Sequence, residues 1–130
     1  MKTKENDTMK ITAFYPTIAT NNTEKVIKDM EKLGFRIIHR RFDLFEKGDT
    51  EYVLETENGQ RMDVVSCPEI EENFYAIRVN VDDFDEAMKI YAEEGYTVFK
   101  GPSILPDSKN VTLFAPDKLP VLLMQHIKKD

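Results

Sequence analysis

Two segments of this chain, 61 positions apart, carry the same helix pattern. One runs from Asn22 to Gly34 and the other from Asp83 to Gly95, and an aromatic residue follows each glycine. Asn and Asp are typical first caps of helices, and Gly is typical of the residue just past a helix end. The apolar residues of each segment recur at helical spacing on one side: Val26, Ile27, Met30 and Leu33, then Phe84, Ala87, Met88 and Tyr91. A repeated unit buries the same surfaces twice, so the sequence predicts two similar modules.

Strand-like segments surround the two helices in the same order. The expected strands cover residues 11–18, 35–42, 51–55 and 61–65, and then 74–81, 96–100, 110–114 and 121–124. Asn58-Gly59 predicts a tight hairpin turn, and residues 115–120 predict the second one. Residues 42–50 and 101–109 are expected to be loops. The predicted fold class is therefore α+β: two tandem βαβββ modules with curved mixed sheets that enclose a cleft, and helices on the outer face.

The length of 130 residues fits one domain with a substantial core. Within it we expect a flexible N-terminal tail (1–9), a first module (10–66), a linker (67–73) and a second module (74–127). The linker contains Pro68 and three glutamates, which favour an irregular segment.

The charge of the chain argues against a nucleic-acid partner. The net charge is −6, the pI is near 5.0, and lysine and arginine are scattered among acids. The longest aliphatic run, residues 121–124, is too short to cross a bilayer, so no membrane association is expected. Cys67 is the only cysteine, and the N-terminal residues are polar without a signal-peptide pattern. Together these features predict a cytoplasmic protein.

The order and spacing of these elements resemble the vicinal oxygen chelate superfamily, the glyoxalase, bleomycin-resistance protein and extradiol dioxygenase group. The resemblance extends from about Lys10 to Ile127. It rests on the doubled βαβββ order, on Met30-Glu31-Lys32-Leu33-Gly34-Phe35 and Tyr91-Ala92-Glu93-Glu94-Gly95-Tyr96 after the helices, and on Phe114-Ala115-Pro116-Asp117. It implies a ligand-binding cleft and leaves the reaction open, because one fold carries many functions.

Many enzymes of this superfamily hold a divalent metal with one side chain from the first and one from the last strand of each module. The resemblance places these positions at Tyr15, Asp63, Ala76 and Leu122. Alanine and leucine offer no ligand atom, and tyrosine is a poor ligand unless ionised, so no metal and no other cofactor is expected. His39 and His126 match none of the four positions.

Strand alternation assigns two faces to each expected strand. Phe14, Pro16, Ile18, Met62, Val64, Tyr75, Ile77, Val79, Val81, Val121 and Leu123 form an apolar face that we expect the helices to cover. The opposite face is a mixture of polar and apolar groups, as in ligand sites. Its predicted ligand-binding residues are Tyr15, Thr17, Arg61, Asp63, Ala76, Arg78, Leu122 and Met124.

Asp63 and Arg78 allow two interpretations. They form a simple ion pair, or they bind charged groups of a ligand. Three further aromatic residues could line the site, but we expect them to serve core packing or a subunit contact instead: Phe42, Phe45 and Tyr52.

Two functions lead, and a third, a purely regulatory or interaction module with a filled cleft, also remains open. The first is a metal-independent small-molecule-binding protein that sequesters a drug or metabolite, for which the acidic charge favours a cationic or neutral ligand. The second is a lyase- or isomerase-like enzyme with Asp63 as base and Tyr15 or Arg78 at an oxyanion, so catalysis itself is undecided. Members of the superfamily often pair, and we expect a homodimer joined through an exposed strand edge at 52–55 or 10–13.

Overall fold

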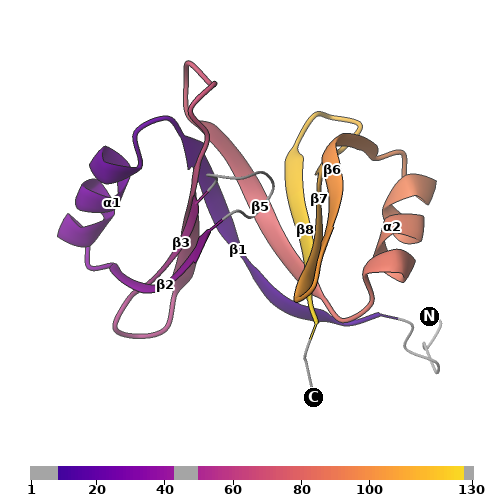
Figure 1. Cartoon of the computed structure of the whole chain (residues 1–130), viewed down its shortest axis with the longest axis horizontal. Helices are drawn as coiled ribbons and strands as arrows, with labels where there is room; N and C mark the ends of the chain where they lie inside the picture. Colours follow the sequence, from indigo (N-terminus) through magenta and orange to yellow (C-terminus); the bar gives the residue numbers. More distant parts are fainter. Residues whose placement is uncertain (1–8, 43–49, 128–130) are drawn as a thin grey trace. The chain divides into compact units, whose positions relative to one another are not determined.

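The computed structural model describes residues 9–42 and 50–127, and its elements follow the predicted order (Figure 1). The first module consists of β1 (Ile11–Thr20), α1 (Thr23–Lys32), β2 (Arg36–Phe42), β3 (Thr50–Glu55) and β4 (Arg61–Ser66). The second consists of β5 (Phe74–Val81), α2 (Phe84–Glu93), β6 (Thr97–Leu105), β7 (Ser108–Phe114) and β8 (Pro120–His126). The α+β class and the two tandem βαβββ modules are confirmed.

The two helices begin and end at positions that differ by 61 residues. Asn22 accepts a hydrogen bond from the Lys25 amide (3.2 Å), and Asp83 accepts one from the Glu86 amide (3.1 Å). At the other end Phe35 N donates to Met30 O and Gly34 N to Glu31 O, and Tyr96 and Gly95 make the same pair of bonds to α2. This is the Schellman pattern, which needs a residue with positive φ; Gly34 has φ 112° and Gly95 has φ 91°.

The chain divides into two compact units, which we call the first unit and the second unit. The first unit is Tyr15–Ile77, and the second combines, among the described residues, 9–14 with 78–127. β1 and β5 therefore each contribute residues to both units. In the second unit, two hydrogen bonds join Lys10 to Asp82: the Lys10 backbone N–H donates to Asp82 Oδ1, and the Asp82 backbone N–H donates to the Lys10 carbonyl.

The first unit contains a mixed sheet in the order β2-β3-β4-β1. β1 runs parallel to β4, whereas β2–β3 and β3–β4 are antiparallel. Val26 of α1 packs with Leu54, Met62 and Val64 of the sheet. Ile18, Ile27, Met30, Phe35, Ile37 and Tyr52 surround this cluster. Apolar burial therefore fixes α1 on one face of the sheet, and Tyr52 serves core packing as expected.

The second unit contains strands in the order β5-β8-β7-β6, with antiparallel β7–β8 and β6–β7 pairs. Buried apolar residues at alternate positions form one face of its strands: Val79 and Val81, Val111 and Leu113, Val121 and Leu123. Phe84 and Ala87 of α2 are also buried, and α2 lies along one side of this sheet (Figure 1). None of the helices in the described part of the chain is long and apolar enough to cross a membrane.

The helix-covered face is shorter than predicted. Ile18, Met62, Val64, Val79, Val81, Val121 and Leu123 are at least partly buried, but Phe14 is 64% exposed and Tyr75 62%, and Pro16 is exposed too. A ten-residue strand spans about 33 Å, whereas a ten-residue helix spans about 15 Å, so the helix covers only part of the strand. Leu33 is also exposed because it caps the helix end.

Two further expectations were wrong. Residues 101–109 are mostly strand, since β6 extends to Leu105 and β7 begins at Ser108. β6 is the last strand in the order and therefore an edge strand. An edge strand tolerates Pro102 because the backbone groups on its outer side need no partner strand. Residues 52–55 are not a free edge, because β3 pairs with both β2 and β4. Most of the other expected loop, including Phe45, lies outside the described residues.

Candidate functional site

The face of the first unit opposite α1 carries both polar and apolar side chains, and we call it the helix-free face. Directly paired residues of neighbouring strands share a face. The register pairs Val53 with Asp63 and Asp63 with Thr17, so these three form one row across β3, β4 and β1. The next row is Glu51, Val65 and Ala19.

Asp63 is the centre of this face. Asp63 is fully buried, and its carboxyl accepts a hydrogen bond from the Thr17 hydroxyl. Burial raises the pKa of Asp63 from 3.8 to about 7, although the hydrogen bond from Thr17 acts in the opposite direction. Near neutral pH this carboxyl therefore exists in both protonation states, and it can accept or donate a proton.

Tyr15 and Glu51 extend the polar surface around Asp63. Tyr15 lies two residues before Thr17 on β1, on the same face, and is buried. Glu51 is 1% exposed, and sequence reasoning missed it. The hairpin register could have identified it. A turn at Asn58-Gly59 that pairs residue 55 with 61 also pairs 51 with 65, which places Glu51 on the same face as Asp63.

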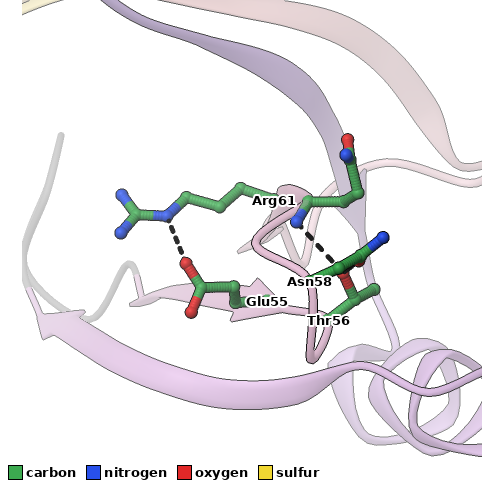
Figure 2. Close-up of polar contacts among 5 residues, drawn as sticks. Glu55, Thr56, Asn58 and Arg61 are labelled. Atoms are coloured by element: carbon green, nitrogen blue, oxygen red, sulfur yellow. Dashed lines mark hydrogen bonds and ion pairs between the residues drawn. The ribbon is translucent and has the colours of Figure 1, made fainter.

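Arg61 lies at the end of this face rather than in its buried part. Its Nε donates to Glu55 Oε2 at 3.0 Å, across the hairpin that joins β3 to β4 (Figure 2). Thr56 stabilises the turn: its hydroxyl donates to Asn58 Oδ1 and accepts from the backbone N–H of Gln60. About half of the Arg61 side chain is exposed, so its contact with Glu55 contributes little to stability.

The second unit has its own helix-free face, and Arg78 is its buried charge. Arg78 is 1% exposed. Its Nε donates to Asn80 Oδ1 at 2.8 Å, and its Nη2 contacts Met124 Sδ at 2.9 Å. The guanidinium is therefore held by neighbours on β5 and β8.

The register extends this face across β7. Asn110 pairs with Met124 and Thr112 with Leu122, so the predicted residues Leu122 and Met124 share their face with two polar side chains. All four are buried, as is Ser108. Sequence reasoning missed Ser108, Asn110 and Thr112 as site residues. The turn at 115–120 was recognised, and its register would have placed them opposite β8.

The two units place contacting side chains at matching positions. Thr17 contacts Asp63 in the first unit, and Arg78 contacts Met124 in the second. Residue 78 follows 17, and residue 124 follows 63, by the same 61 positions that separate the helices. Equivalent places in the two modules therefore carry a carboxyl with a hydroxyl in one case, and a guanidinium with a thioether in the other.

These residues do not fit a divalent metal site. Of the four positions that the resemblance implies, Asp63 bears a carboxylate and Tyr15 a phenol, whereas Ala76 and Leu122 have no donor atom. Within residues 9–42 and 50–127, no group of three His, Cys, Asp or Glu side chains is arranged to hold a metal ion. His39 and His126 are both exposed.

Two predicted features stay predictions. The first is the role of Ala76 as a ligand-binding residue. Ala76 is half-buried and lies in the part of β5 that belongs to the first unit. Asp63 belongs to the first unit and Arg78 to the second, and an ion pair between them stays a prediction.

No protein-family model and no curated protein sequence matches this chain significantly. Solved structures do match. A hypothetical protein from Bacillus halodurans C-125 aligns with TM-score 0.65 at 13% identity, over 95% of this chain and 98% of that one. A methylmalonyl-CoA epimerase aligns with TM-score 0.59 at 18% identity, over 88% and 94%. A glyoxalase/bleomycin resistance protein/dioxygenase superfamily member from Vibrio splendidus 12B01 aligns with TM-score 0.55 at 14% identity, over 89% and 99%.

The fold is therefore that of the vicinal oxygen chelate superfamily, as the resemblance implied. At these identities the comparison establishes the fold, and the chemistry has to be argued from this chain's own residues.

Proposed function

We propose that this protein binds a small organic molecule without a resident metal ion, and that it sequesters a drug or metabolite. The observation that carries the proposal is the burial of Asp63 and Arg78 on helix-free faces. Buried polar and charged groups need partners that offset the cost of their desolvation, and a face that serves packing alone is usually apolar. Ligand sites, in contrast, combine apolar walls with a few fixed polar groups.

The donor atoms support the metal-independent part of the proposal. Of the four ligand positions that the resemblance implies, two are occupied by Ala76 and Leu122, whose side chains have no donor atoms. Elemental analysis of the purified protein should find Ni, Zn, Mn and Fe well below one equivalent per chain. A stoichiometric metal would contradict the proposal.

A ligand panel tests the binding function directly. It should contain cationic glycopeptides, planar neutral aromatics and aromatic carboxylates, with thermal unfolding and tyrosine fluorescence as readouts. A ligand at a hundred times its Kd stabilises the folded state by about 2.7 kcal/mol, which is a measurable shift in Tm. Absence of any stabilisation or quenching across the panel would count against a binding function.

The second candidate function is proton transfer by Asp63, as in a lyase or isomerase. It is favoured by the raised pKa of Asp63, because a general base works best when its pKa is near the working pH. Tyr15 on the same face supplies a hydroxyl for an oxyanion, and a methylmalonyl-CoA epimerase shares the fold. Deuterium uptake from D2O by a panel of carbon acids detects such activity. Uptake that survives in Asp63→Asn would exclude Asp63 as the base.

We further propose that the protein acts in the cytoplasm as a homodimer. Support comes from the single cysteine and from strand-edge residues that are exposed in the described structure, such as Ile11 of β1.

A further inference from the structure

β2 is the terminal strand of the first unit, so among the described strands its outer side has no neighbour. Its inner side pairs regularly with β3 from His39 to Phe42, after a register shift between Ile37 and His39. The outer side of such a strand offers backbone N–H and C=O groups, and extended peptides bind these edges by adding a strand. Residues 39–42 therefore form a regular edge to which a partner strand can pair.

The side chains of β2 are basic. The strand contains Arg36, Arg40 and Arg41 among seven residues and no acid, in a chain whose net charge is −6. β6 is the terminal strand at the matching position of the second unit, and it carries one charged side chain, Lys100, in nine residues. The edge position in this fold therefore does not itself require a basic strand.

The glutamates of β3 offset only part of this charge. Arg41 lies opposite Glu51, and Arg36 lies opposite Glu55. Glu55 is shared, because the Nε of Arg61 donates to its Oε2 at 3.0 Å from the other side. The charge of Arg36 is therefore less fully compensated than a one-to-one pairing would provide.

Arg40 has an uncharged partner. Its Cζ lies 5.7 Å from the centroid of the Tyr52 ring, and the residue is exposed. An aromatic ring attracts a guanidinium through its face and leaves the charge of the cation unchanged. The planar guanidinium also matches the two oxygens of a carboxylate. Arg40 thus combines a preferred position over Tyr52 with N–H donors that suit an acidic side chain.

We propose that β2 binds an extended acidic peptide segment of a partner protein, which adds a strand along residues 39–42 and places carboxylates beside Arg36 and Arg40. A second copy of β2 fits this edge poorly. If two copies paired antiparallel along residues 39–42, Arg40 of each would lie opposite Arg41 of the other, and like charges opposite each other are destabilising. Phe42 is 65% exposed and offers an apolar contact at the end of the same edge. This surface does not depend on the proposed small-molecule function.

Two acetylated octapeptides test the proposal: one of alternating glutamate and valine, and one with glutamine in place of each glutamate. Each is titrated into the full-length chain at low salt, and backbone amide shifts and amide hydrogen exchange are followed by NMR. We expect the glutamate peptide to bind at least tenfold more tightly, with the largest shifts at residues 39–42 and slower exchange within β2. Equal affinity of the two peptides, shifts confined to other residues, or no binding would overturn the proposal.

Matched double variants separate this edge from the total charge of the chain. Arg36→Gln combined with Arg40→Gln should weaken binding of the glutamate peptide at least tenfold. Lys28→Gln combined with Lys32→Gln removes two exposed lysines of α1 in the same unit and should leave that affinity unchanged. Equal losses in the two double variants would overturn the proposal. If the arginine double variant does not fold, the two peptides decide on the natural chain alone.

A single-stranded oligonucleotide distinguishes strand addition from general attraction to anions. Both ligands are negatively charged, but only the peptide supplies a backbone that pairs with β2 as a strand. We expect the glutamate peptide to slow amide exchange in β2 and the oligonucleotide to leave it unchanged. Tighter binding of the oligonucleotide at residues 39–42 would overturn the proposal in favour of a nucleic-acid partner.

Discussion

At the scale of single residues, position determines the chemistry of each charged group. Asp63 is buried on a sheet face beside the Thr17 hydroxyl, and its pKa rises to about 7. Arg61 occurs on the same strand only two residues away, yet it lies at an exposed hairpin end. The two side chains therefore differ in burial and in the free energy that their charges contribute.

The raised pKa of Asp63 makes stability depend on pH. Between pH 3.8 and about 7 the folded state holds a proton that the unfolded state has lost, so the free energy of unfolding falls as pH rises. One pKa unit corresponds to about 1.4 kcal/mol, so the fall is on the order of 4 kcal/mol across this range. Asp63→Asn should abolish this component and gain stability relative to the natural chain as pH rises from 4 to 8. Urea unfolding at several pH values measures it, and parallel curves for the two proteins would refute the assignment.

The hydroxyl of Thr17 should matter most when Asp63 is ionised. Thr17→Val removes a donor to a buried carboxylate, which costs about 1–3 kcal/mol. The loss should be larger at pH 8 than at pH 5, since the protonated carboxyl depends less on an external donor. Thr17→Ser keeps the hydroxyl and is the control. Equal losses at both pH values would show that Thr17 acts through packing alone.

At the scale of elements, local sequence signals predicted both helices and six of the eight described strands closely. Caps and terminal glycines act within a few residues, so they can be read without tertiary structure. The errors concern β6 and β7, where Pro and Ser residues indicated a loop. Pairing of residues 103–105 with β7, which no local signal encodes, extends β6 to Leu105.

The two helix-end glycines provide a matched test. Both have positive φ, so replacement by alanine should cost about 1 kcal/mol at each position. A Cβ at Gly95 would meet Pro116 Cγ at 3.2 Å, whereas a Cβ at Gly34 would meet no atom within 4 Å. Gly95→Ala should therefore destabilise more than Gly34→Ala in urea unfolding. The reverse order would contradict the tight contact with Pro116.

At the scale of the whole molecule, the proposed homodimer can be tested without knowledge of the ligand. Sedimentation velocity at micromolar concentration should give about 30 kDa, twice the 15.1 kDa of one chain. A charged substitution at Ile11, which is exposed on β1, should shift the distribution toward the monomer if this edge is the interface. A 15 kDa species throughout the concentration range would refute the dimer.

The sequence alone determined the repeated βαβββ order, the helix limits and the absence of donor atoms at Ala76 and Leu122. These features depend on residue type and short-range spacing. Tertiary structure decided which polar groups are buried and which meet: Thr17 with Asp63, Arg78 with Asn80 and Met124, and Glu51 at the same face as Asp63. It also showed that Phe14 and Tyr75 are exposed. Burial and contact depend on segments that are far apart in the chain. Period-two alternation predicts which face of a strand a residue lies on, but it does not predict what covers that face.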